Sequence, residues 1–236
     1  LAVTIANYFL SATTLFSFLW VQLFAFSGGL IVICCVYFIS FFTLSRNFSM
    51  VILAGIALSS LCTALTFFLL MIQSQKSLSI LSFLFGSFNT VDWEIVVYAS
   101  PIILCGIFFL SFYGRTLNIL QIGLEESKTL GIDAHKMNVI LIFVASIMTC
   151  SAVALAGIIG FVGLVIPHLC RLLFGNDYQR LIIFSGFIGA IFLILVDDSV
   201  RTVIAPREIP IGAMTALVGS PLFIYFLVIK KRNYNL

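Results

Sequence analysis

The chain has 236 residues, of which 62% are hydrophobic and 9% charged, and its formal net charge is +3. A soluble domain carries about 25% charged residues, so this composition excludes an ordinary soluble fold. It also excludes a nucleic-acid-binding surface, which needs clustered Lys and Arg on a soluble face. The apolar runs are continuous, whereas a membrane β-barrel shows short alternating segments. The sequence therefore predicts an all-α, polytopic transmembrane helical bundle.

The chain supplies about eight apolar runs, each near the roughly 20 residues that a helix needs to cross a membrane. In chain order, the predicted spans are Leu1–Leu19, Phe24–Leu44, Met50–Gln73, Glu94–Tyr113, Met137–Ala156, Gly157–Phe174, Leu181–Val200 and Ile211–Ile229. Only Ser27, Gly28, Gly29 and their neighbours separate the first predicted span from the second. The chain starts in apolar sequence at Leu1 without a signal-peptide n-region. We therefore expect the natural N-terminus to lie further upstream. The series of spans predicts one transmembrane domain over residues 1–236.

The basic residues predict the orientation, because cytoplasmic loops carry an excess of Lys and Arg. With eight crossings, one side holds Arg46, Arg115, Lys128, Lys136, Arg171, Arg180, Lys230, Lys231 and Arg232. The other side holds Lys76, Arg201 and Arg207. We expect the side with nine basic residues, which includes the C-terminus, to face the cytoplasm.

A compact polar segment lies between the fourth and fifth spans. Residues 125–136 read EESKTLGIDAHK and hold five charged residues, in a chain with 12 basic and 9 acidic ones. Such a segment offers a contact surface to a partner in water. The stretch is helix-prone but broken at Gly131, because glycine readily adopts turn conformations. The sequence predicts two short helices joined by a turn.

Two later segments are interrupted by glycine and proline. From Gly157 to Cys170 there are only 14 residues, about 21 Å of helix, less than the membrane core. This predicts a short, tilted or broken crossing. Residues 205–223 predict a half-helix that dips into the outer leaflet before the last span. Paired broken segments indicate a transport pathway, although ordinary kinks in a bundle remain the alternative.

The cysteines and His168 carry no clear chemistry. None of the six cysteines forms a C-x-x-C pair, and metal-site spacing is absent. We interpret the cysteines as small packing residues and His168 as a structural hydrogen-bonding residue.

Five ordered motifs resemble the FecCD family, the permease subunits of ABC importers for iron–siderophore complexes, haem and vitamin B12. They are VILAGIALSSL (51–61), LSFLFGSFNTVDW (81–93), LNILQIGLEESKTLGIDAHK (117–136), GFVGLVIPHLCRLLFGNDYQRLI (160–182) and DDSVRTVIAPREIPIGAMTALVGSPLFIYFL (197–227). Family members have ten spans and both termini in the cytoplasm. The resemblance therefore implies a bacterial cytoplasmic-membrane protein, here without about two N-terminal spans.

The resemblance implies three sites. Residues 117–136 match the cytoplasmic coupling loop that docks on an ATPase subunit, with Glu125, Glu126, Lys128, Gly131 and Asp133 as the contacting face. On the outer face, Arg201 matches an arginine that pairs with a glutamate of the substrate-binding protein, and Arg207 is a second candidate. Asp197 lies one helical turn before Arg201, so an internal salt bridge is the open alternative. Asn47, Phe48 and Ser49 match the cytoplasmic gate, where the family often has small hydroxyl residues.

The implied partners follow from the same resemblance. The chain has no G-x-x-x-x-G-K-[ST] phosphate loop, so it is not expected to hydrolyse ATP itself. We expect a transport subunit and not an enzyme, with no bound cofactor or metal. ATP and Mg²⁺ would be used by two separate ATPase subunits. The other partners would be a second permease subunit (identical or a paralogue), an extracytoplasmic binding protein and membrane lipid. We expect inward transport of an iron–siderophore complex, with haem or cobalamin as alternatives.

Two other classes fit less well. An ion-coupled secondary transporter would hold ionisable residues at mid-membrane depth, and the predicted spans have none near their centres. An intramembrane enzyme would need a motif such as H-E-x-x-H or G-x-S-x-G, and both are missing.

Overall fold

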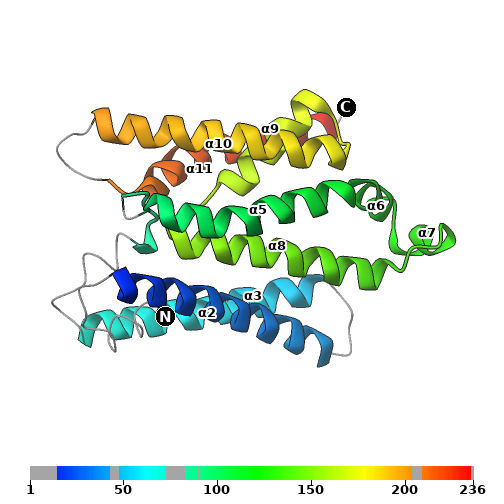
Figure 1. The fold of residues 1–236 in the computed structure, drawn as a ribbon. Coiled ribbons are helices and arrows are strands. Elements are labelled where there is room, and N and C mark those ends of the chain that lie inside the picture. Colours follow the sequence, from blue (N-terminus) through cyan, green and yellow to red (C-terminus); the bar gives the residue numbers. More distant parts are fainter. Residues whose placement is uncertain (1–14, 43–47, 73–82, 90, 204–208, 235–236) are drawn as a thin grey trace.

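A computed structural model describes residues 15–42, 48–72, 83–89, 91–203 and 209–234, and these residues form no strand. The helices are α2 (Leu15–Phe42), α3 (Phe48–Ile72), α5 (Trp93–Phe112), α6 (Gly114–Leu120), α7 (Leu124–Thr129), α8 (Ala134–Ala156), α9 (Val162–Phe174), α10 (Tyr178–Val203) and α11 (Ile211–Tyr234). Figure 1 shows the long helices lying side by side as a bundle.

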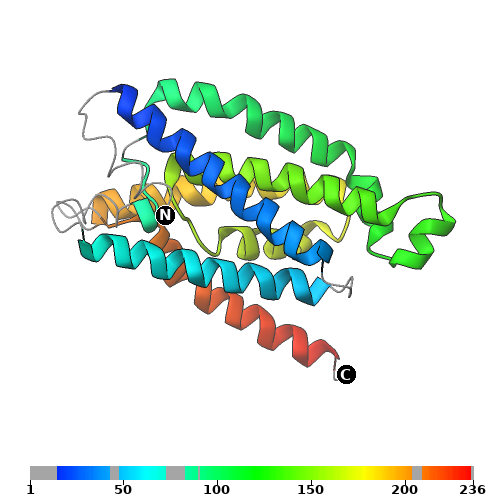
Figure 2. The same cartoon turned by 90° about the horizontal axis from the view of Figure 1, so that it is seen from below.

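The middle of the bundle is formed by α5 and α8, which pack against each other. Helix α8 also packs on α2, and α2 packs on α3. On the other side, α10 contacts α5, α6, α9 and α11. Figure 2 shows α11 diverging from its neighbours toward its C-terminal end. Large apolar side chains cover much of the exterior, as a lipid-facing surface requires.

Among the described residues, three helices are long and apolar enough to cross a membrane. They are α3, α8 and α10, over residues 52–72, 136–156 and 178–202. Helices α5 and α6 form a fourth candidate as a pair bent by 54°. Helices α2, α9 and α11 contribute shorter apolar stretches, over residues 23–39, 162–174 and 211–226. The all-α bundle is confirmed, and its later helices begin and end close to the predicted spans.

The predicted break between the first two spans is wrong. Helix α2 runs without interruption through residues 20–23 and through Ser27, Gly28 and Gly29. The Ser27 hydroxyl donates to the carbonyl of Phe24, one turn earlier, and so is satisfied within the helix. Gly29 faces α8, where an added Cβ would lie 2.6 Å from Cys150 Sγ. The glycine is therefore a helix–helix contact. Residues 1–14 lie outside the described part.

The first interrupted segment is broken as predicted. Helix α8 ends at Ala156 and α9 begins only at Val162, so residues 157–161 are not helical. Gly157 has φ +72° and Phe161 has φ +65°. A left-handed conformation is rare for a bulky residue such as Phe161 and marks backbone strain where α9 begins.

The predicted half-helix before the last span is not found in residues 209–223. Helix α11 begins at Ile211 and continues through Pro221 to Tyr234 as one helix. Proline inside a helix removes one hydrogen bond, and here the helix continues beyond it. Residues 205–208 lie outside the described part, so this correction concerns the segment from Ile209 onward.

At one end of the bundle, three glycines allow backbone segments to meet. We call Gly86, Gly157 and Gly212 the glycine junction. An added Cβ at Gly212 would strike the carbonyl oxygens of Phe85 and Ile158, and one at Gly86 would lie 2.7 Å from the Ile158 oxygen. The Ser87 N–H also donates to the Ala156 carbonyl at 2.8 Å. The junction fixes residues 83–89, the α8–α9 connection and the start of α11 together.

An apolar cluster lies beside the glycine junction and includes the end of α10. Val196 and Val200 of α10 are buried with Ile211 of α11. Phe88 and Ile159 pack against this cluster. The final turns of α10 are therefore fixed to the same segments that the glycine junction joins.

Candidate coupling segment and outer charged site

The two ends of the bundle differ in charge. We call one end the basic end, because Arg115, Lys128, Lys136, Arg171 and Arg180 lie there, on α6, α7, the start of α8, the end of α9 and the start of α10. We call the other the outer end, after the side on which the sequence predicts it to lie; it holds Arg201 and the glycine junction. The described cations thus divide as the positive-inside rule predicts for a cytoplasmic basic end.

The polar segment lies at the basic end and projects from it. In Figure 1, α7 lies beyond the ends of the long helices. Helix α6 turns away from α5 at Tyr113, and α7 follows Gly123, which has φ +148°. The turn at Gly131 is confirmed, with φ +78°. Asp133 then caps α8, accepting from the Lys136 N–H at 3.2 Å.

The prediction of two short helices flanking Gly131 is half right. One short helix, α7, precedes the glycine, but the residues after it enter the long helix α8 directly. Asp133 explains the difference, since a side-chain acceptor before the first turn allows the helix to begin there. The second short helix, α6, lies earlier in the chain than predicted.

The projecting segment presents most of the predicted face to solvent. Glu126, Lys128, Gly131 and Asp133 are exposed, whereas Ser127 and Ala134 are buried beneath them. The backbone of Glu125 is described, in α7, but its side chain lies outside the described part.

The sequence reasoning missed two apolar residues at this end. Leu130 is 61% exposed and Ile122 is 65% exposed. Leu130 lies between the predicted contacts Lys128 and Gly131. Attention to charge alone hid it, and a single exposed apolar residue gives no strong signal in a sequence.

The start of α10 is joined to α6 by a polar network that the sequence did not reveal. Asn118 Nδ2 donates to Asp177 Oδ1 at 2.8 Å, and the Tyr178 N–H donates to Asn118 Oδ1 at 2.9 Å. The Gln179 N–H donates to Asp177 Oδ1 at 3.1 Å. The Asn118 amide, followed by the Gln179 N–H, lowers the pKa of the Asp177 carboxyl. We call these four residues the α6–α10 latch.

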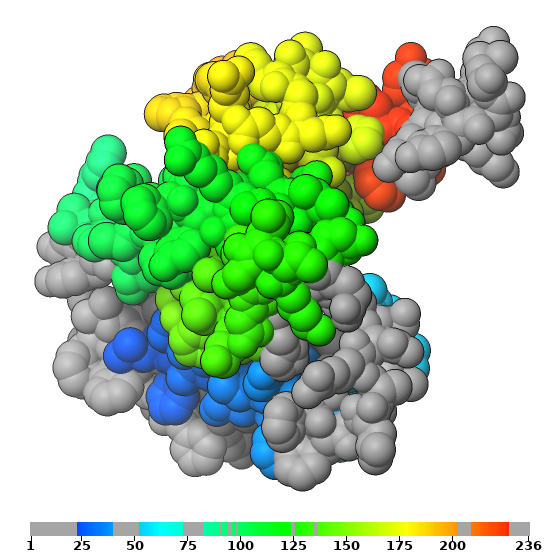
Figure 3. Space-filling model, turned by 90° about the vertical axis from the view of Figure 1, so that its right-hand side faces the viewer, coloured from blue at the N-terminus to red at the C-terminus, as the bar shows by residue number. Residues whose placement is uncertain are grey.

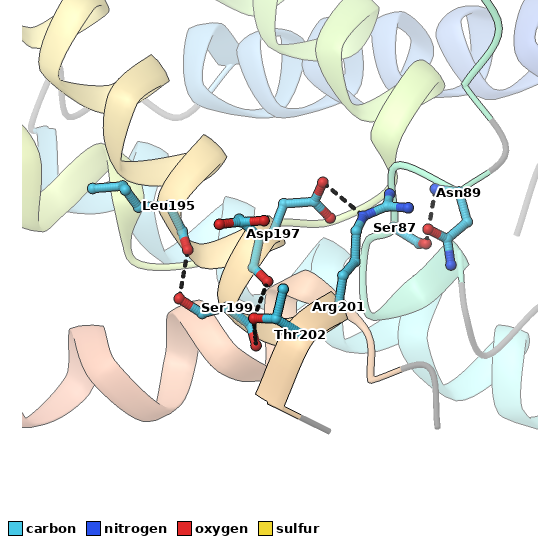
Figure 4. A network of polar contacts seen from close by, with 8 residues as sticks. Ser87, Asn89, Leu195, Asp197, Ser199, Arg201 and Thr202 are labelled. Carbon is cyan, nitrogen blue, oxygen red and sulfur yellow. Dashed lines mark hydrogen bonds and ion pairs between the residues drawn. The ribbon is translucent and has the colours of Figure 1, made fainter. Parts of the chain in front are cut away.

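At the outer end, Arg201 is paired within its own helix. Its Nε donates to Asp197 Oδ2 at 2.9 Å, the internal pair that the i,i+4 spacing had left open as an alternative. Figure 4 shows the Arg201 side chain extending toward the loop that holds Ser87 and Asn89. The Arg201 side chain is still 51% exposed, against 24% for Asp197. The internal salt bridge therefore exists, and the arginine remains accessible.

The remaining predicted residues lie outside what the structure describes. Arg207 and Asn47 fall in undescribed segments, and Phe48 and Ser49 are seen only as backbone at the start of α3. The His168 ring packs beside Phe226, with 5.0 Å between ring centroids. Within the described residues, no three His, Cys, Asp or Glu side chains are grouped as a metal site requires.

The described fold, apolar helices with a projecting polar segment at a basic end, defines a polytopic helical membrane protein. The model of the FecCD transport family matches residues 1–229, and the chain belongs to that family.

Relatives and a solved structure agree with this assignment. The chain is 36% identical over 207 residues to the cobalamin import system permease protein BtuC of Halobacterium salinarum, covering 88% of this chain and 56% of that protein. It is 34% identical over 173 residues to the probable siderophore transport system permease protein YfiZ of Bacillus subtilis, covering 73% and 52%. The chain thus spans little more than half the length of these relatives.

The structural comparison covers more of the fold. A solved structure described as an inward-facing conformation of a metal-chelate type ABC transporter superposes with a TM-score of 0.83 and 35% sequence identity. It matches 97% of this chain, which covers 71% of that structure's chain.

Proposed function

We propose that this chain is the membrane-spanning permease subunit of an ABC importer that carries an iron–siderophore complex inward. Membership of the FecCD transport family over residues 1–229 is the observation that carries this proposal. The partners are a second permease subunit, two cytoplasmic ATPase subunits that use ATP and Mg²⁺, and an extracytoplasmic binding protein. The chain lies in a bacterial cytoplasmic membrane with its basic end and C-terminus in the cytoplasm.

In this proposal the projecting segment is the contact with the ATPase. Three features support the assignment: it protrudes from the bundle, it lies among the basic residues, and it exposes charged residues around one apolar side chain. Figure 3 views this end directly, with α6 and α7 in green beside the yellow start of α10. Glu125, Glu126, Lys128, Gly131 and Asp133 form its contact face. We add Leu130 as the apolar anchor, since a buried hydrophobic centre within a polar rim is typical of protein interfaces.

Arg201 is the docking residue for the binding protein at the outer end. Its guanidinium is half exposed while one edge is held by Asp197. A guanidinium has five N–H donors in a planar fork, so the edge not used by Asp197 remains available to a partner carboxylate. Arg207 is the second candidate, and Asn47, Phe48 and Ser49 form the cytoplasmic gate.

The carried substrate is a metal chelate. The relatives include a cobalamin permease and a probable siderophore permease, which support a chelate, and also a molybdate permease, so the choice among substrates is our proposal. We propose an iron–siderophore complex, with cobalamin and haem as the alternatives of the same chemical class. All are bulky chelates that a weakly binding cavity can release, as a transporter must.

The test is to purify the protein from its own membranes and reconstitute the recovered complex in proteoliposomes. We expect an ATPase to co-purify, and ATP with the binding protein to drive uptake of a radio-iron-labelled siderophore complex. Labelled cobalamin and haem in parallel would identify the alternatives. Uptake that a protonophore abolishes while ATP has no effect would overturn the ABC importer assignment in favour of a secondary transporter.

A further inference from the structure

The α6–α10 latch joins the two parts of the chain to which separate roles are proposed. Asn118 belongs to α6, which leads directly into the projecting segment. Asp177, Tyr178 and Gln179 form the first turn of α10 and the residue before it. The opposite end of the same helix carries Arg201. One helix therefore extends from the candidate ATPase contact to the candidate docking residue.

Both the nitrogen and the oxygen of the Asn118 side-chain amide form hydrogen bonds in the latch. Asn118 donates to the Asp177 carboxylate and accepts from the Tyr178 backbone, so its orientation is fixed by two partners. Gly114 allows α6 to approach, because an added Cβ there would lie 2.5 Å from the Gln179 side chain. Arg171 of α9 donates to the Tyr178 hydroxyl at 2.9 Å. These contacts tie α6, α9 and α10 together at the basic end.

The other end of α10 is fixed as well. Val196 and Val200 are buried against Ile211, Phe88 and Ile159, next to the glycine junction. Rigid secondary elements joined by packed side chains and hydrogen bonds are the kind of structure that carries coupling between distant sites.

We infer that Asn118 and Asp177 are positioning residues that make α6 and α10 move as one body. Through this latch, movement of the projecting segment reaches the outer end beside Arg201. The inference rests on the proposed function, because the movement it transmits is the one that the ATPase would impose. The bond from Asn118 to Asp177 is a charge-assisted amide–carboxylate hydrogen bond, which is directional. Water can reach it, because the Asp177 side chain is 41% exposed.

The test uses an exchange of the two side chains. Asn118→Asp places two carboxylates against each other and breaks the latch by repulsion. Adding Asp177→Asn restores one amide and one carboxylate with their positions reversed. In the double variant, the aspartate at 118 still accepts from the Tyr178 N–H. The asparagine at 177 donates its amide N–H to that aspartate where Asp177 Oδ1 accepted from both Asn118 and the Gln179 N–H, so the bond from Gln179 is given up and recovery is expected to be large but incomplete.

Two measurements are made on the wild type and both variants. Hydrogen exchange of the protein alone reports on the latch, and the ratio of siderophore uptake to ATP hydrolysed in the reconstituted complex reports on coupling. In N118D we expect exchange to rise together in residues 114–120 and 178–180. We also expect the uptake-to-ATP ratio to fall by about tenfold, the order expected for losing a hydrogen bond to a charged group. The double variant should recover most of both.

Each outcome decides between the two proposals. The latch inference is overturned if N118D has a normal uptake-to-ATP ratio. It is also overturned if hydrogen exchange increases at residues 178–180 while exchange in α6 is unchanged. Recovery of hydrogen-exchange protection without recovery of the ratio in the double variant shows a merely structural contact and also overturns it. If the wild type shows no ATP-driven uptake, the proposed function fails, and exchange alone decides whether the latch is one unit. If N118D cannot be purified, Asn118→Ser replaces it with the same expectations.

Discussion

Apolar side chains pack against both ends of α10, but the two ends differ in the further contacts that fix them. At the basic end, side-chain amide and carboxylate groups of the α6–α10 latch form the connection, in water and with one carboxylate 41% exposed. At the outer end, backbone carbonyls approach Gly86, Gly157 and Gly212, and apolar side chains fill the surroundings. A polar group that leaves such a contact can hydrogen-bond to water instead, whereas closely packed atoms have no room to move. The connection at the basic end therefore includes hydrogen bonds that a single substitution can remove, while the connection at the outer end depends on close backbone packing.

The largest expected effect is at the outer end. Gly212→Ala adds a Cβ that strikes the carbonyls of Phe85 and Ile158, neither of which can rotate away. We expect a loss of about 2–3 kcal/mol of stability, and a thermal unfolding midpoint lowered by roughly 5–10 °C in detergent.

Gly186→Ala on α10 is the matched control for this substitution. Nothing lies within 4 Å of the Cβ it adds, so the unfolding midpoint should stay the same or rise slightly. A Gly212→Ala protein as stable as the Gly186→Ala protein would show that the outer end is not sterically fixed, and the contrast between the two ends would be lost.

The next effect concerns the projecting segment. Replacing Glu125 and Glu126 with Lys reverses two charges in the proposed contact face. Because Glu126 is exposed, we expect an unchanged unfolding midpoint but uptake reduced by at least about tenfold, since like charges across an interface are strongly unfavourable. The Glu→Gln pair at the same positions keeps the shape and should show a smaller loss. Unchanged binding-protein-stimulated ATPase activity in the Lys variant would refute the coupling assignment.

Leu130 tests the same surface through its apolar part. Leu130→Ala removes a side chain that is 61% exposed in the chain alone and that we expect to be buried by the ATPase. Burial of a leucine contributes about 1.5–3 kcal/mol, so ATPase affinity should fall by roughly tenfold. The neighbouring Thr129→Ala is the control. Equal affinities for the wild type and Leu130→Ala would remove this residue from the interface.

Sequence patterns predicted the elements well wherever the signal was local. The apolar runs located α3, α5, α8, α10 and α11 because a membrane helix satisfies its own backbone and needs only length and hydrophobicity. The i,i+4 spacing of Asp197 and Arg201 offered their salt bridge as an alternative, because residues four apart lie on the same face of a helix. The glycine break in α2 was wrong because a glycine can serve either as a turn or as a close helix contact. Only the position of Cys150, far away in sequence, decides between them.

The latch shows what local patterns cannot reveal. Asn118 and Asp177 are 59 residues apart, and each taken alone is an ordinary polar residue near a helix end. Their meeting depends on the bend between α5 and α6 and on the packing of α10 against α6. Both are tertiary features, and a single sequence without its relatives holds no record of them.

A smaller effect is expected at Arg201. Arg201→Glu should weaken binding of the binding protein by roughly threefold to tenfold, and more at low salt, because exposed ion pairs contribute modestly and are screened. Asp197→Asn is the matched variant, since it frees the guanidinium without removing it and should leave binding intact. If Arg201→Glu binds normally at low salt, the arginine serves only its internal pair with Asp197.

The smallest effect is a pH dependence at the latch. Because the Asn118 amide and the Gln179 N–H lower the pKa of the Asp177 carboxyl, its ionised form is favoured in the folded protein. The stabilisation is present above the unfolded aspartate pKa of about 3.9 and is lost as pH falls through the lower folded value. Arg180 and Arg115 act in the same direction. We expect unfolding midpoints measured from pH 6 to pH 3 to fall by less in Asn118→Ala than in the wild type. Identical pH profiles would mean that the amide does not hold the carboxylate in its charged form. The basic end would then depend on packing, as the outer end does.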